Sequence, residues 1–304
     1  MEPTLPTDLE RLVFETAAIA RPTSIPDLML VASRVKVWIE PLLYRVIFLS
    51  NSVREDLGRP FHIPIFTVDS LSLLVRTRPR TCFRRVEHVH IGSSVNLSTV
   101  ESLFAVCGGI TNIFAHFSGQ DPDSALIALS ALHNVQYLAI AGITIFFYPS
   151  PKTPHSLFLT VTHLELFQMQ DISSKDKESI CAKLTLIPQL THVALNLQFD
   201  DSRWHAALCT DTRLQCIVFL SSWSYTVDEG SVIPLREDER FVCIEQQLDY
   251  REDWLRGAVT GQDYWALADD FIAARRKGKV PRMYPIFPVE RQSGYLFNLD
   301  RNMV

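Results

Sequence analysis

Three of the nine histidines occupy one position in a repeated sequence pattern. His88, His163 and His192 each stand directly before an apolar residue that is followed, two positions later, by a second one. If the segments around His163 and His192 are neighbouring strands, about 4.8 Å apart, the two imidazoles are adjacent. A zinc site needs three or four ligands, and this pair supplies only two. We therefore interpret the histidines as a polar ladder on an open face and predict no metal and no cofactor.

The cysteines and the motifs also give no sign of catalysis. None of the six cysteines forms a Cys-x-x-Cys pair, and several stand in apolar positions where a free cysteine packs as a small hydrophobic side chain. Glycine-rich nucleotide-binding motifs, Gly-x-Ser-x-Gly and His-Glu-x-x-His are absent from the sequence. We expect a protein without enzymatic activity and with reduced cysteines. Because the sequence starts without a basic and apolar leader, we expect it in the cytoplasm or the nucleus.

The histidines belong to a pattern of six positions, read as apolar, x, x, apolar, x, apolar. Val161-Thr162-His163-Leu164-Glu165-Leu166 is one copy. The copies begin 24 to 29 residues apart, at Val86, Ile110, Val135, Val161, Leu190 and Leu214. A short strand that recurs every 20 to 29 residues is typical of leucine-rich repeats. The sequence thus predicts an α/β fold, a leucine-rich-repeat-like solenoid with parallel strands, N-terminal helices and a C-terminal helical cap.

Amphipathic segments between the strands are expected to be helices. They cover residues 96–107, 121–132, 173–186 and 202–208. Asp121-Pro122 suits a helix start, with proline at the first helical position, and Ser173 with Asp176 resembles a capping box. The asparagine that many leucine-rich repeats keep three residues after the pattern is missing. We therefore regard the repeats as degenerate.

Alternation along a strand predicts which side chains are available to a partner. The fourth and sixth pattern positions should face the core, so the third, fifth and seventh should face the open, concave side. Exposed aromatic residues among polar ones are typical of interfaces. The candidate partner-binding residues are Phe114, His116, Tyr137, His163, Glu165, Phe167 and His192. The alternative is that a loop or the C-terminal segment, such as the proline-rich stretch 280–288, covers this face.

The sequence outside the repeats predicts three further segments. We predict a helical segment over 1–50, an irregular connector with one helix at 68–77 over 51–85, repeats over 86–245 and a helical cap with a tail over 246–304. In the cap, Tyr264, Leu267, Ala268, Phe271 and Ile272 share one helical face after a break near Gly261. The basic run 275–279 suits either a helix C-terminus or a nuclear import signal.

The N-terminal segment resembles a known docking module. The match comprises Leu5-Pro6-x-Asp8-Leu9, Val13-Phe14, Asp27-Leu28, Val31, Arg34 and Trp38. These residues resemble the F-box, and with the repeats the chain resembles the F-box-like, leucine-rich-repeat-like proteins of mushroom-forming fungi. The resemblance implies docking on the Skp component of SCF-type ubiquitin ligases, with Leu5, Pro6, Leu9, Val31 and Trp38 as candidates. The stretch 15–26 is longer than in an F-box, and the alternative is that helices 7–20 and 27–39 only cap the repeats.

The composition of the chain argues against nucleic acid and membrane as partners. The formal net charge of −5 gives no support for nucleic-acid binding, which needs a clustered basic face. The longest apolar run, 138–147, is about half the roughly 20 residues of a membrane helix. We therefore predict a protein-binding adaptor, for which the resemblance implies the role of substrate-recognition subunit of a ubiquitin ligase. The alternative is a stand-alone interaction module. The target protein and the oligomeric state cannot be read from the sequence.

Overall fold

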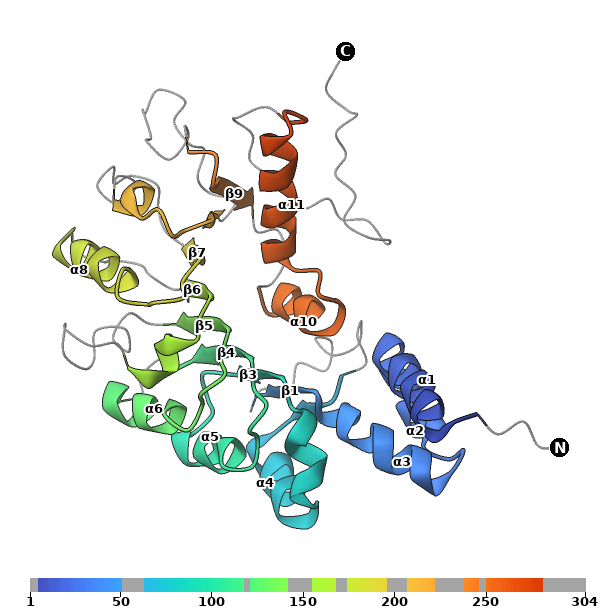
Figure 1. Cartoon of the computed structure of the whole chain (residues 1–304). Coiled ribbons are helices and arrows are strands. Elements are labelled where there is room, and N and C mark those ends of the chain that lie inside the picture. The colour runs from blue at the N-terminus through green and yellow to red at the C-terminus, as the bar shows by residue number, and fades with distance from the viewer. Residues whose placement is uncertain are drawn as a thin grey trace. The chain divides into compact units, whose positions relative to one another are not determined.

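The repeated pattern forms parallel strands, as the sequence predicts. The computed structural model describes residues 5–50, 63–117, 121–141, 155–167, 174–195, 207–221, 238–245 and 250–280. They belong to two units, Met1–Val135 and Gln136–Val304. Every strand pair with a defined register is parallel, and in the described residues helices lie between several of the successive strands (Figure 1). The protein therefore has an α/β fold of the leucine-rich-repeat type.

The first unit has the strand order β2-β1-β3-β4. Its strands are β1 (Val46–Leu49), β2 (Ile65–Phe66), β3 (His88–Ile91) and β4 (Asn112–His116). Val89 pairs with Ile113 and Ile91 with Ala115, so equivalent pattern positions lie side by side. β1 and β2 precede the first copy of the pattern, and the sheet therefore begins before Val86, where the repeats were predicted to start.

The helices of the first unit begin where polar caps predict. Asn96 accepts a hydrogen bond from the backbone N–H of Thr99 at the start of α5 (Leu97–Phe104), and Asp121 does the same for Ser124 at α6 (Pro122–Leu129), both at 2.9 Å. α4 (Val68–Thr77) fits the helix predicted in the connector. A 3-10 helix, η3 (Arg80–Arg85), leads from it toward β3.

The N-terminal helices are more broken than predicted. The elements are α1 (Thr7–Ala20), η1 (Pro22–Ser24), α2 (Ile25–Leu28), α3 (Ser33–Ile39) and η2 (Glu40–Tyr44). The prediction of one helix over 27–39 is wrong, because Ala32 is extended (φ −162°, ψ 153°) and interrupts it. The break leaves Val31 exposed while Val35 and Ile39 join a small core with Ala18, Ile25 and Leu42.

The second unit has the strand order β5-β6-β7-β8-β9. Its strands are β5 (Tyr137–Ala141), β6 (His163–Phe167), β7 (His192–Leu195), β8 (Cys216–Ser221) and β9 (Phe241–Glu245). Its helices are η4 (Ser156–Leu159), α8 (Ser174–Leu184), α10 (Tyr250–Thr260) and α11 (Tyr264–Arg276). The predicted break stands at Gly261, whose φ of 73° suits glycine. Of the predicted capping box, Ser173 lies outside the described residues.

α11 packs against the strand face of the second unit. Its predicted apolar stripe is buried in one cluster with β7, β8 and β9 residues on the side opposite the pattern's fourth and sixth positions (Figure 1). The strand residues of that cluster are Ala194, Cys216, Val218, Leu220, Val242 and Ile244. Within the described part of the chain, no helix combines the length and the apolar character that crossing a membrane requires.

Candidate functional site

In the first unit, the predicted open face carries a column of stacked rings. The rings of Phe48 and His90 lie 3.9 Å apart and those of His90 and Phe114 lie 4.6 Å apart, both nearly parallel. The strand register places these three residues side by side, so each ring covers the next. Phe114 is 1% exposed, and the prediction that it faces solvent is wrong. His116, at the end of β4, is half-buried.

In the second unit, the predicted open face is largely covered. Phe167, Glu165 and His192 are 2%, 6% and 8% exposed, so the prediction that they face solvent is wrong. Tyr137 and His163 are half-buried. The alternative that the C-terminal segment covers this face is correct here, but the covering element is α11, and residues 281–288 lie outside the described residues. The sequence contained a signal for this: Cys216, Val218 and Leu220 are all apolar in outward positions, as expected of strands buried on both faces.

The predicted histidine pair is present beneath α11. His163 pairs with His192 in the register of β6 and β7, and their rings stack at 3.9 Å. Tyr137 stacks on the other side of His163 at 4.1 Å, and the ring of Trp265 meets both imidazoles edge-on, at 5.2 and 6.0 Å. Burial, and then the neighbouring His192, lower the pKa of His163 to about 3. His163 is therefore neutral at physiological pH and acts as a packed ring.

A buried carboxyl group links α11 to the centre of β6. The hydroxyl of Tyr264 donates a hydrogen bond to Oε2 of Glu165 at 2.9 Å, and burial raises the pKa of Glu165 to about 8. Asp253 accepts from the backbone N–H of Tyr264, and Asp263 caps α11 through the N–H of Ala266. Burial also raises the pKa of Asp263, to about 6. Glu165 thus attaches α11 to the strand face, whereas Asp253 and Asp263 bond to backbone N–H groups at the start of α11.

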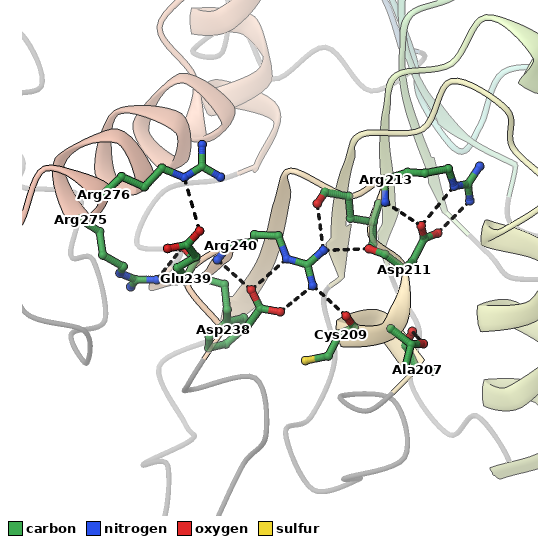
Figure 2. Close-up of polar contacts among 12 residues, drawn as sticks. Ala207, Cys209, Asp211, Arg213, Asp238, Glu239, Arg240, Arg275 and Arg276 are labelled. Atoms are coloured by element: carbon green, nitrogen blue, oxygen red, sulfur yellow. Dashed lines mark hydrogen bonds and ion pairs between the residues drawn. The ribbon is translucent and has the colours of Figure 1, made fainter.

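Two Asp-x-Arg segments, which sequence analysis missed, join successive repeats just before β8 and β9. Figure 2 shows that Asp211 pairs with Arg213 and Asp238 with Arg240, at 2.8 and 2.6 Å. Each aspartate also accepts from the backbone N–H of its arginine. Each guanidinium then donates to carbonyl oxygens of the preceding repeat. These contacts satisfy backbone carbonyl groups of the preceding repeat, in a chain whose pattern lacks the asparagine of many leucine-rich repeats.

The basic run at the end of α11 contacts the same region. Arg275 donates to the backbone carbonyls of Glu239 at 3.1 Å and Phe241 at 2.7 Å, and Arg276 lies 3.9 Å from the Glu239 carboxylate (Figure 2). The guanidinium of Arg275 also stands over the ring of Phe271 at 4.7 Å. The arginines thus fasten the C-terminal end of the helix to the segment that enters β9, and a nuclear import role stays a prediction.

The N-terminal docking candidates lie mostly on the surface. Leu5, Leu9 and Val31 are 51%, 50% and 62% exposed, and Pro6 is also exposed. Trp38 is half-buried and packs against the small core of the N-terminal helices. The structure therefore leaves four of the five candidates accessible and assigns Trp38 to packing.

Comparisons with known proteins place the chain in no family. No known protein family matches it, and no curated protein matches it. Among solved structures, it is similar to the leucine-rich repeat-containing protein LegL7 from Legionella pneumophila, at 15% identity and a TM-score of 0.42, over 76% of this chain and 78% of that one. The parallel register of the strands, rather than this distant likeness, establishes the fold.

Proposed function

We propose that the chain is a protein-binding adaptor whose N-terminal helices dock a Skp-type ligase component and whose repeats hold a target protein. The observation that carries the proposal is an apolar stripe on the outer side of α1. Leu9, Leu12 and Ile19 follow helical spacing and are 45% to 59% exposed, and Leu5, just before the helix, is 51% exposed. Val13, beside them, is 58% exposed.

This stripe is not needed for the internal packing of the helix. α1 buries Ala18 and packs Phe14 in the core of the N-terminal helices, on another side. A helix that buries a single face normally carries polar residues on the opposite one. A row of large apolar side chains facing solvent is instead typical of a protein-interaction surface.

The resemblance to the F-box implies that a Skp-type protein binds this apolar surface. Leu5, Pro6, Leu9 and Val31, which match its pattern, are all exposed. Arg34 pairs with Glu10 at 2.7 Å and so ties α1 to α3, with Leu9 and Val31 both left outside. An adaptor of this kind does no covalent chemistry, because it acts by raising the effective concentration of a target near the ligase.

A stand-alone interaction module is the second candidate, and one set of contacts favours it. The ring of Tyr44 packs against Phe83 at 5.7 Å, and Arg85 lies 3.6 Å from Glu15. The N-terminal helices therefore rest on η3, the element that precedes β3, as a cap of the repeats would do.

Co-purification with the Skp-type protein of the source organism distinguishes the two candidates. Leu9→Asp and Val31→Asp should each weaken binding more than tenfold, because each puts a charge into the apolar contact, a loss of at least about 1.4 kcal/mol. Leu73→Asp and Ile127→Asp are matched controls, since these residues are 60% and 66% exposed on α4 and α6. All four variants should keep the wild-type melting temperature within a few degrees. Wild-type protein that fails to bind at micromolar concentration would exclude the ligase role and leave the stand-alone module.

A further inference from the structure

Three side chains able to bind a metal meet between the strand face and α11. His192 of β7, Cys216 of β8 and Asp269 of α11 each place a ligand atom within 4.8 Å of the other two, and they are the one such group of three in the described part of the chain. The strand register sets His192 beside Cys216. Nε2 of His192 lies 3.1 Å from Oδ1 of Asp269.

The hydrogen bonds around His192 direct a lone pair into this space. The hydroxyl of Thr191 lies 2.7 Å from Nδ1 of His192 and donates its own proton to the carbonyl oxygen of Thr162, at 3.2 Å. In the tautomer in which this hydroxyl accepts the Nδ1–H of the imidazole, the neutral ring has its lone pair on Nε2. A hydrogen bond that fixes the distal nitrogen in this way is typical of metal-binding histidines.

Two acceptors consequently face each other. The carboxylate of Asp269 also presents lone pairs, and at 3.1 Å from Nε2 it needs a cation or a proton between them. Bonds of about 2.0 to 2.2 Å from zinc to nitrogen and oxygen give a tetrahedral N to O separation of about 3.3 Å. The observed distance is close to that edge, so a metal would need little movement of these two groups.

The chemistry of the three ligands favours one class of ion. Imidazole nitrogen, thiolate sulfur and carboxylate oxygen are the donors that zinc uses in proteins, whereas calcium and magnesium prefer oxygen alone. The Asp269 side chain is 54% exposed, which gives an ion a route from solvent, while Cys216 is fully buried and shielded from oxidation.

We propose that His192, Cys216 and Asp269 bind a zinc ion, with the fourth position open to water or another ligand, and that the ion fastens α11 to the strand face. Binding replaces the thiol proton of Cys216, which passes to solvent, while the carboxylate and the imidazole contribute lone pairs. The proposal is independent of the adaptor role, because the three ligands lie on β7, β8 and α11 and none belongs to the N-terminal helices.

The test uses the full-length chain, freed of metal with a chelator and titrated with Zn²⁺ or Co²⁺. The wild type should bind one equivalent, gain a thiolate-to-cobalt charge-transfer absorption and melt at a higher temperature. Asp269→Asn, Cys216→Ala and His192→Gln should each lower the affinity by more than about a hundredfold, because loss of an outer partner alone costs roughly 10- to 100-fold. Cys107→Ala and His88→Gln, which change the same residue types in the first unit, should bind like the wild type.

Asp269→Asn is the deciding variant. Its side chain is half-exposed, so the amide should fold even if the variants at buried Cys216 or His192 do not. If the wild type shows no thiolate absorption, or if Asp269→Asn binds with wild-type affinity, the proposal is wrong, and His192 and Asp269 form only a hydrogen-bonded pair.

Discussion

α1 and α11 are helices of similar length, but the apolar stripe of α1 is exposed and that of α11 is buried. α1 has 14 residues and α11 has 13, and both carry large apolar side chains at helical spacing. The stripe of α11 is less than one tenth exposed, whereas Leu9 and Leu12 of α1 are 50% and 59% exposed. An apolar stripe on a helix therefore predicts that this side is covered, but it does not identify the surface that covers it. α11 finds its partner inside the chain, because β8 offers Cys216, Val218 and Leu220.

The polar contacts of α11 are also more buried than those of α1. α11 is held by the buried Tyr264–Glu165 hydrogen bond and by Arg275 bonded to two backbone carbonyls. α1 is held by ion pairs of partly exposed residues, Glu10 with Arg34 and Glu15 with Arg85. Exposed ion pairs contribute little stability, so the N-terminal helices depend mainly on their small core.

The largest effect should come from removing a buried ring of α11. Phe271→Ala deletes a side chain that is 4% exposed and should lower the free energy of unfolding by about 3–5 kcal/mol. Urea unfolding followed by tryptophan fluorescence measures this, since Trp265 lies on the same helix. A loss below 1 kcal/mol would mean that α11 is not packed on the strands in solution.

A middle-sized effect should appear as a pH dependence. The carboxyl of Glu165 has its pKa raised from 4.5 to about 8, so the folded state holds a proton that the unfolded state releases. Stability is therefore lost as pH rises toward 8, by about 1.5 kcal/mol between pH 6.5 and 8. His163 and His88, whose pKa values burial lowers to about 3 and about 4, give the opposite slope up to and just above pH 6.5, and Asp263 also titrates near pH 6, so a comparison with a variant at Glu165 is needed to isolate its contribution.

Glu165→Gln is the control for this dependence. The amide can still accept the hydrogen bond of Tyr264 but has no proton to lose, so the decline between pH 6.5 and 8 should disappear. Chemical unfolding at several pH values measures it. An unchanged slope in this variant would assign the dependence to another group.

The smallest effect should come from the stripe of α1. Leu12→Ala removes a side chain that is 59% exposed and should change the free energy of unfolding by less than about 0.5 kcal/mol. Urea unfolding alongside Phe271→Ala gives a direct contrast between the two stripes. A cost close to that of Phe271→Ala would show that the stripe of α1 is covered in the free protein.

The sequence was informative about elements and less so about what covers them. The strands that the pattern predicts, the helix start at Asp121 and the apolar stripe of α11 are confirmed, because they depend on local spacing. The burial of Phe114 and Phe167 was missed, because alternation indicates which side a residue faces and not whether that side is covered. The proposed zinc site was not predicted, because Asp269 meets His192 from 77 residues away.

The Asp-x-Arg segments bear on whether repeats can be added to this protein by gene duplication. Asp238 follows Asp211 by 27 residues, and Arg240 donates to the carbonyl oxygens of Asp211 and Leu214 in the preceding repeat, on either side of its own equivalent Arg213. A stretch of 27 residues that starts at Asp211 contains the donor Arg213, which bonds to the repeat before it, and the acceptor carbonyls of Asp211 and Leu214, which bond to the repeat after it. An in-frame duplication would therefore produce a copy that finds its contacts on the copy before it, which makes this end of the protein suited to lengthening by gene duplication without redesign of the junction.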